Sequence, residues 1–482
     1  MGRRAVDHAE VGIVPVRPRG GLGLALLTAA VVVAAGIALD GRGPRAEPAS
    51  PALPPSSGAW LCPHGGGEGW RTDLYVANPG GSPVQIRVTP LATRRAGSAS
   101  AYTVDPGTEL RIGAASGDEA SSSYVEYFGG WVATGWVTHA GGERSGVAAE
   151  PCAAEPGTRW FAADGTTERG EGAGLVVMNP FDVDAVVDVT VFSERRAPIR
   201  ESGFTNVRIE AHHSRLLRLE TVSADEPAAA GEVVAHAGRV AVASLGVSRD
   251  GGIRSVVAAP TLSERVLLAG TRDVGQSTLA VMAPGAGEVR FGAGLLSEGR
   301  PEAAGGLTEA AQSGQSARAF PLITQGPSLV DLEVASGSPP LVAVRRSEGL
   351  NGDPGATGGT PAAATSWVVL PTVGGSPNAP GMVLGNPGAT PVEVTLTMLG
   401  AEGVPEGVPE GVEEETTVTV PPTSAVGVPV GFIERDPTAA VLAVAAEGTF
   451  VAAGASSSLG REGVASYAVA AGVPVPSYVR VP

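Results

Sequence analysis

Apolar and polar residues alternate after four similar turns along this chain. The turns are marked by Asn78-Pro79, Asn179-Pro180, Ala283-Pro284 and Asn386-Pro387, which recur roughly every hundred residues. Six, eight and ten residues after the start of each pair, the side chains are apolar: Val84, Ile86 and Val88; Ala185, Val187 and Val189; Val289, Phe291 and Ala293; Val392, Val394 and Leu396. Alternation with a period of two is typical of antiparallel strands with one buried face. The sequence therefore predicts one folding unit that is used four times.

Each unit contains further short strand-like runs separated by turn residues. About seven or eight strands per hundred residues predict an all-β fold of tandem immunoglobulin-like β-sandwich repeats. The alternative is a propeller-like ring. A typical blade needs only about 40 to 50 residues, so a unit twice that long favours sandwiches that follow one another in an open series.

The repeats set the predicted domain boundaries. The sandwiches are expected at residues 59–155, 158–263, 264–350 and 365–482. The third is degenerate, because it lacks an opening tryptophan and has Ala283 where the others have asparagine. A Gly-rich stretch at 351–364 predicts a flexible linker before the fourth sandwich.

The N-terminal region predicts a membrane anchor. Residues 20–39 carry no charge, and arginines such as Arg17 and Arg19 precede them. Twenty apolar residues in a helix span about 30 Å, so we expect a transmembrane helix or signal anchor with residues 1–19 as a cytoplasmic tail. Residues 40–58 predict a Pro-rich linker, and everything beyond them lies outside the cytoplasm. A cleaved signal peptide is the alternative; the length of the apolar run favours the uncleaved anchor.

Composition narrows the class of protein. The chain has 69 Gly and 40 Pro, yet 43% of its residues are hydrophobic, which favours a packed β core over disorder. The net charge is −16, so we expect no binding to nucleic acid. All basic residues are arginine, which indicates a GC-rich genome.

Two cysteines, Cys62 and Cys152, lie in the first and last strand-like segments of the first repeat. In a secreted context this favours a disulfide, and two unpaired core thiols are the alternative. A metal site is not expected there, because no further ligands lie in sequence range.

Some aromatic and amide residues recur at fixed places in the repeat. Trp60, Trp160 and Trp367 each open a unit, ahead of Asn78, Asn179 and Asn386 respectively. Recurrence at one structural position predicts that these tryptophans pack in the core. The asparagine side chains are expected to bond the backbone two residues further on.

Other aromatic residues are concentrated in the first repeat. Its candidates for a binding surface are Trp70, Tyr124, Tyr127, Trp131 and Trp136. Exposed Tyr and Trp side chains stack on sugar rings or anchor protein interfaces. Trp131 and Trp136 are an odd number of positions apart and would face opposite sides of an unbroken strand. Ordinary core packing is the other interpretation of this group.

Catalytic and metal-binding motifs are not found in the sequence. The nucleophile and phosphate-binding motifs are missing, and the chain has no lysine. Asp182, Asp184 and Asp188 match only part of a calcium loop, and His212-His213 sits at an expected turn. We therefore expect no catalytic residue, no metal and no cofactor.

The Arg-flanked N-terminal span, the Pro-rich spacer and units that run from Trp into Asn-Pro resemble a family of actinobacterial envelope proteins of unknown function. The resemblance implies location and modular β architecture and transfers no activity. We expect a non-catalytic cell-envelope scaffold or binding protein, with a cell-wall glycan or an envelope protein as its partner. Two alternatives are a carbohydrate-binding protein acting through the first repeat and an envelope hydrolase without a recognisable motif.

Overall fold

The structure of the chain is a computed structural model. It describes residues 57–94, 97–141, 146–249, 251–273, 277–298, 300–303, 307–324, 326–348, 354–370, 381–401, 415–433, 439–459 and 465–479. Residues 55–482 form one compact unit. The predicted tail at 1–19, the predicted span at 20–39 and nearly all of the linker at 40–58 lie outside the described residues. Within the described part, the helices are too short or too polar to cross a membrane.

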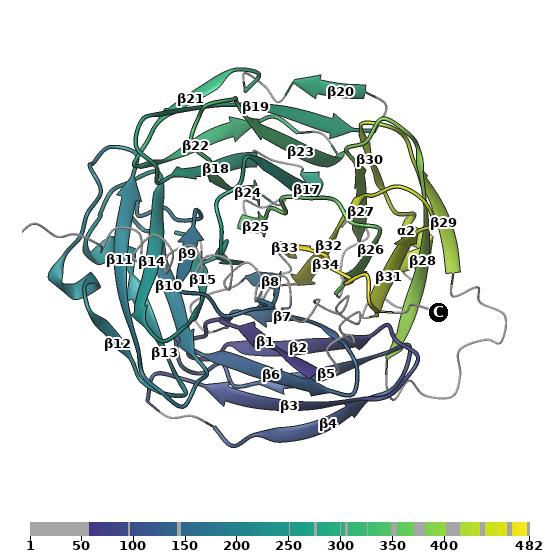
Figure 1. Ribbon diagram of the computed structural model, residues 1–482, viewed down its shortest axis with the longest axis horizontal. Helices are drawn as coiled ribbons and strands as arrows, with labels where there is room; N and C mark the ends of the chain where they lie inside the picture. Colours follow the sequence, from purple (N-terminus) through teal and green to yellow (C-terminus); the bar gives the residue numbers. More distant parts are fainter. Residues whose placement is uncertain are drawn as a thin grey trace, which may run out of the picture. The chain divides into compact units, whose positions relative to one another are not determined.

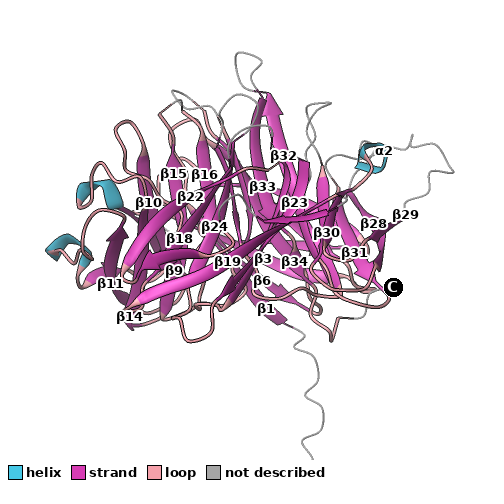
Figure 2. Ribbon diagram, turned by 90° about the horizontal axis from the view of Figure 1, so that it is seen from above, coloured by secondary structure: helices cyan, strands magenta, loops and turns pink. Residues whose placement is uncertain are grey.

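The described residues are almost entirely strands and loops (Figure 2). Their helices are single turns: η1 (Ser202–Phe204), η2 (Leu219–Thr221) and α2 (Val430–Ile433). The strands form small, almost wholly antiparallel sheets, which confirms the all-β prediction. The alternating pattern is also seen, because Val84, Ile86 and Val88 are buried while Gln85 and Arg87 between them are exposed.

Each of the first two repeats contributes two four-stranded sets. In the first repeat the orders are β1-β6-β3-β4 and β5-β2-β7-β8, and in the second they are β9-β14-β11-β12 and β13-β10-β15-β16. The bounds in the first repeat are β1 (Ser57–Cys62), β2 (Arg71–Asn78), β3 (Val84–Leu91), β4 (Ser100–Val104), β5 (Thr108–Ala114), β6 (Ser122–Phe128), β7 (Ala133–His139) and β8 (Val147–Pro151). Those in the second are β9 (Arg159–Ala162), β10 (Gly172–Asn179), β11 (Ala185–Ser193), β12 (Val207–Ile209), β13 (His213–Arg218), β14 (Ala229–Ala237), β15 (Ala241–Val247) and β16 (Ile253–Val257).

The third and fourth repeats keep this plan. The third has β17-β23-β19-β20, with β21 also on β19, and β22-β18-β24-β25; the fourth has β26-β31-β28-β29, with β34 beside β26, and β30-β27-β32-β33. Their bounds are β17 (Arg265–Asp273), β18 (Ser277–Ala283), β19 (Glu288–Ser297), β20 (Arg300–Ala303), β21 (Ala310–Ser313), β22 (Ser316–Leu322), β23 (Gly326–Val334), β24 (Val342–Glu348), β25 (Pro354–Gly358), β26 (Ser366–Val369), β27 (Met382–Asn386), β28 (Val392–Ala401), β29 (Glu415–Val420), β30 (Ser424–Gly427), β31 (Ala440–Ala445), β32 (Val451–Leu459), β33 (Ala465–Ala471) and β34 (Val473–Pro474).

The third repeat has all the strands of the others, so the prediction of a linker at 351–364 is wrong for its central part. β25 pairs antiparallel with β24, from Val344↔Gly358 to Glu348↔Pro354. The Gly-rich composition suggested flexibility. These small residues instead form a strand in the crowded interior, where larger side chains would not fit.

Recurring tryptophans connect the two sheets inside a repeat. The indole N–H of Trp60 donates to the carbonyl of Val132 at 2.7 Å, that of Trp160 to Val240 at 2.8 Å and that of Trp367 to Phe450 at 2.7 Å. All three rings are buried. The same side chain therefore makes the same bond in three repeats, as core packing requires.

Recurring asparagines fasten the turn after the second strand. Asn78, Asn179 and Asn386 each accept the backbone N–H two residues on, and each donates through Nδ2 to the carbonyl four residues on, at 2.8 Å. Each Nδ2 also donates to a carbonyl of the strand opposite. The asparagine thus holds the turn and the neighbouring strand together.

The four repeats close on themselves within this compact unit. The last strand of each repeat, β8, β16, β25 or β33, packs against the last strand of the next repeat, and β33 packs against β8. Figure 1 shows β8, β25 and β33 near the centre. The fourth repeat also joins the first through a parallel pairing of β28 with β5, at Gly400↔Thr108 and Ala401↔Glu109. The prediction of an open series is therefore wrong.

Ring closure follows from how sheets pack. The first sheet of each repeat faces the second sheet of the next: Phe161 and Phe192 share an apolar cluster with Met282 and Val342, and Leu329 shares one with residues such as Val383. Unit length did not exclude a ring, because each repeat supplies two sheets and not one. Each sheet has four or five strands and about 50 residues, which is the usual length of one propeller blade.

Candidate functional site: an axial cavity

The ends of the four inner strands surround a cavity of about 410 Å³. Its wall is built mainly from small apolar residues and prolines. Among them are Val257, Ala258, Val344, Gly358, Ala471 and Pro474. A mainly apolar cavity of this size is in the range that holds small molecules in proteins. It is therefore the candidate functional site.

Equivalent backbone bridges position the wall. The residues just beyond the inner strand of each repeat pair antiparallel with the first strand of the same repeat. The pairs are Leu61↔Ala153, Phe161↔Ala259, Leu267↔Thr360 and Val368↔Val473. In the last three repeats the next residue is a proline, Pro260, Pro361 or Pro474. Proline has no backbone N–H, so these rim positions present no donor to the opening.

Glu150 of β8 closes the inner end of the cavity. Its side chain is buried, and it accepts hydrogen bonds from the backbone N–H groups of Val257 and Gly358. A Cβ at position 358 would lie 3.2 Å from Glu150 Oε1, so glycine permits this close approach. Burial raises the pKa of Glu150 well above its usual value. The carboxyl connects inner strands of the first three repeats.

A buried ionic group lies between the second and third repeats. Asp164 Oδ2 accepts from Arg254 Nε at 2.9 Å, Asp164 Oδ1 accepts from Arg346 Nε, and Arg346 Nη2 donates to the carbonyl of Gly165 at 2.7 Å. Burial alone would raise the pKa of Asp164, but the two guanidinium groups outweigh it and lower that pKa. Since Arg346 belongs to the third repeat, this ion pair fastens two neighbouring repeats.

Sequence comparison places the chain in a family. Residues 126–379, more than half of the 482 residues, match the family described as "Family of unknown function (DUF5719)". The chain belongs to this family. No curated protein matches the DUF5719 chain significantly.

One solved structure is similar in part: "Crystal structure of tetra-tandem repeat in extending region of large adhesion protein". It is 12% identical, and the match covers 82% of the DUF5719 chain and 92% of that chain, with a TM-score of 0.10. At this TM-score the similarity carries no argument. The predicted actinobacterial source and envelope location of the DUF5719 protein stay predictions.

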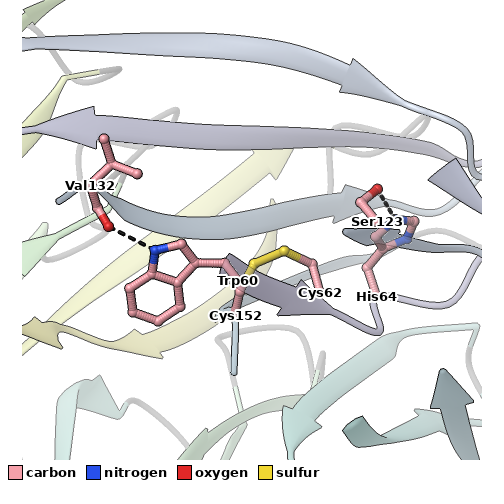
Figure 3. Close-up of a disulfide and its surroundings, with 6 residues drawn as sticks. All are labelled: Trp60, Cys62, His64, Ser123, Val132 and Cys152. Carbon is pink, nitrogen blue, oxygen red and sulfur yellow. Dashed lines mark hydrogen bonds between the residues drawn. A yellow bond between two sulfur atoms is a disulfide. The ribbon is translucent and has the colours of Figure 1, made fainter. Parts of the chain in front are cut away.

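The disulfide predicted for this DUF5719 protein is confirmed. Cys62 and Cys152 are bonded, with their Cα atoms 4.6 Å apart (Figure 3). The bond joins β1 to the residue that follows β8, and Cys152 also lines the cavity. The disulfide therefore connects the first strand of the first repeat to the segment that follows its last strand, beside the cavity.

The predicted aromatic binding surface is wrong for most of its members. Trp131, Trp136 and Tyr127 are only 6%, 1% and 7% exposed. Trp131 packs edge-on against Trp60, and Trp136 faces the core because it pairs with Leu74 of β2.

The remaining two residues of that surface are half-buried. Trp70 precedes β2, and Tyr124 packs against the core of the second repeat. Trp131, Trp136 and Tyr127 thus fill the core of the first repeat, and Tyr124 lies at its interface with the second. They do not form an exposed row.

A serine–histidine pair lies beside the disulfide. His64 Nε2 is 3.1 Å from Ser123 Oγ, and His64 Nδ1 is 2.7 Å from the carbonyl oxygen of Gly65 (Figure 3). Both side chains are buried. Burial lowers the pKa of His64 to about 4, so the ring is neutral near neutral pH. The pair is shielded from solvent and does not line the axial cavity.

The acidic and histidine residues of the second repeat form separate surface pairs. Asp182 bonds His212 at 2.7 Å, Asp188 bonds His236 at 2.8 Å, and Asp184 bonds Arg208. Across the part of the chain that the structure describes, no three potential metal ligands cluster.

The sequence analysis did not identify the cavity. Three repeats follow the inner strand with a proline, in Ala259-Pro260, Thr360-Pro361 and Val473-Pro474, and this recurrence is a signal in the sequence that marks the cavity wall.

Proposed function

We propose that this DUF5719 protein is a non-catalytic scaffold or binding protein of the cell envelope, positioned outside the cytoplasm. The observation that carries the proposal is the axial cavity, which is enclosed by four repeats locked to one another. A rigid wall formed from the ends of strands suits binding, because little ordering is needed when a ligand enters. We also interpret each repeat as a variant of the immunoglobulin-like sandwich, with two facing sheets and a strand order of its own.

The disulfide supports a location outside the cytoplasm. Disulfides persist in oxidising compartments and are rare in the cytosol. The predicted anchor at residues 20–39 leads to the same location. Together they favour a protein held at the outer side of the membrane.

A non-catalytic role is favoured by the surroundings of the ionisable groups. Glu150 is buried and held by backbone donors, Asp164 is neutralised by two arginines, and His64 is enclosed with Ser123. Each of these groups has a structural partner. General acid or base catalysis requires a group that reaches the substrate.

Location can be tested by labelling one new thiol. Val183 is 64% exposed, and both native cysteines are paired, so Val183→Cys creates a single reactive site. We expect a membrane-impermeant maleimide to label this variant in intact cells of the native host. The wild type is the matched control and should stay unlabelled. Labelling that occurs only after lysis would place the repeats in the cytoplasm and contradict the proposal.

A further inference from the structure

The accessible wall of the axial cavity is uncharged. Glu150 is the single acidic or basic side chain among the residues that line it, and its Oε2 is fully buried. Val257, Ala258 and Val344 from three different strands present apolar side chains. A charged ligand would lose its hydration there without gaining a partner.

Three of the four side-chain hydroxyl groups along the wall are already bonded within the protein, and the fourth, that of Thr261, belongs to an exposed residue. Ser244 Oγ donates to the carbonyl of Val256 at 3.3 Å, Thr360 Oγ1 donates to that of Ala362 at 3.0 Å, and Ser263 Oγ donates to that of Arg265. The rim prolines contribute no N–H. A sugar, which needs many hydrogen bonds, is therefore poorly matched to this site.

The enclosure is arranged around an axis. Four inner strands and the segments that follow them surround the space, and the rim residues Pro260, Pro361 and Pro474 are exposed. An unbranched chain can enter such a space end-on and bury its methylene groups against all four repeats.

We propose that the axial cavity binds the single hydrocarbon tail of an uncharged lipid, with its hydroxyl-bearing end at the rim. This inference rests on the proposed function as a binding protein and names the class of ligand. The net charge of −16 adds to the preference for an uncharged ligand over a fatty acid anion.

Binding of 1-octanol, 1-decanol and 1-dodecanol to the purified chain with its disulfide intact tests the proposal. Titration calorimetry should show affinity rising about fourfold for each added methylene, the value for burying one CH₂ group. Dodecanoate should bind at least tenfold more weakly than dodecanol. Equal binding of alcohol and anion, or no dependence on chain length, would overturn the proposal.

Variants of the cavity wall test whether the alcohols bind in the axial cavity. Val257→Trp fills the cavity and should abolish binding, and Val183→Trp, on the outer surface, should leave it unchanged. Leu262→Arg, in the loop after the second inner strand, places a charge at the wall and should also abolish binding. Near-UV circular dichroism checks the fold of each. Unchanged binding in a folded Val257→Trp or Leu262→Arg would place the ligand elsewhere and overturn the proposal.

The two proposals fail separately. If dodecanol does not bind but the Val183→Cys variant is labelled in intact cells, the ligand class is wrong and the location stands. If labelling requires lysis, the envelope function is wrong whatever binds in the cavity.

Discussion

Gln312 Nε2 donates a hydrogen bond to the carbonyl oxygen of Val281 at 3.3 Å. The same Nε2 reaches the carbonyl of Ser316 at 3.0 Å. Gln312 pairs with Val289, so it stands where Val420 stands in the fourth repeat, opposite Val392. The third repeat has Ala283 in place of the turn asparagine, and an amide from the facing strand makes the connection instead. The third repeat therefore lacks the turn asparagine but keeps a side-chain amide that connects the two sheets, supplied by Gln312.

These amides should contribute similarly to stability. Asn179→Ala and Gln312→Ala each leave buried carbonyl groups without a donor, which costs about 1–3 kcal/mol. Urea unfolding followed by tryptophan fluorescence measures the loss. Gln85→Ala, which removes an exposed amide bonded to Thr103, is the matched control and should change stability by less than about 0.5 kcal/mol. No loss in Gln312→Ala would contradict its compensating role.

Asp164 should be needed for the joint between the second and third repeats. Asp164→Asn removes the buried carboxylate that both Arg254 and Arg346 contact, which costs about 3–5 kcal/mol. Thermal unfolding measures the loss, and Glu288→Gln, whose partner Arg290 is exposed, is the control. A loss no larger than in the control would show that the buried pair contributes little.

The Asp164 carboxylate should also make the folding stability depend on pH in the acidic range. In the folded protein the pKa of the Asp164 carboxyl is lowered below its ordinary value of 3.8. The carboxylate therefore contributes its full stabilisation of the folded state above pH 3.8, and this stabilisation is lost as the pH falls through the folded pKa. Below pH 3.8, wild type should lose stability faster than Asp164→Asn. Parallel pH profiles would contradict this assignment.

His64 should make folding stability depend on pH in a higher range than Asp164 does. Its pKa falls from 6.5 to about 4 on folding, so the unfolded chain binds the proton more tightly. Stability is complete above pH 6.5 and declines as pH falls towards 4, by about 3 kcal/mol in total. Denaturant midpoints measured between pH 7 and pH 4 test this, and His64→Gln should remove most of the slope. His212→Gln, an exposed histidine paired with Asp182, is the control and should keep it.

The disulfide should stabilise the first repeat strongly. It closes a loop of 90 residues, for which the chain-entropy relation gives about 4–5 kcal/mol. A Cys62→Ser, Cys152→Ser double variant should unfold at a lower temperature in scanning calorimetry. Reducing agent should shift wild type in the same direction and leave the variant unchanged; a shift of both would show a different cause.

The strands and core residues of a single repeat could be predicted from the sequence, but the closure of the four repeats into a ring could not. Alternation after Asn78 and the recurrence of Trp60 depend on neighbours within one repeat, so spacing alone predicted a β unit and its core. The path of the ring depends on which sheet faces which, as in Leu370 packing over Gly135, and no local pattern encodes that contact. The same reason explains why Trp131 and Trp136 were open to two interpretations, since their burial depends on partners elsewhere in the fold.

The pairing of β28 with β5 has a consequence for biogenesis. The surface of the first repeat that receives the fourth is synthesised some three hundred residues before its partner. Until the fourth repeat has emerged, apolar side chains of the first repeat such as Tyr75, which pairs with Gly135 beneath Leu370, lack their final cover, and a nascent chain is open to aggregation. Rapid completion of the last repeat, or a chaperone that holds the first repeat until then, would therefore limit aggregation during synthesis.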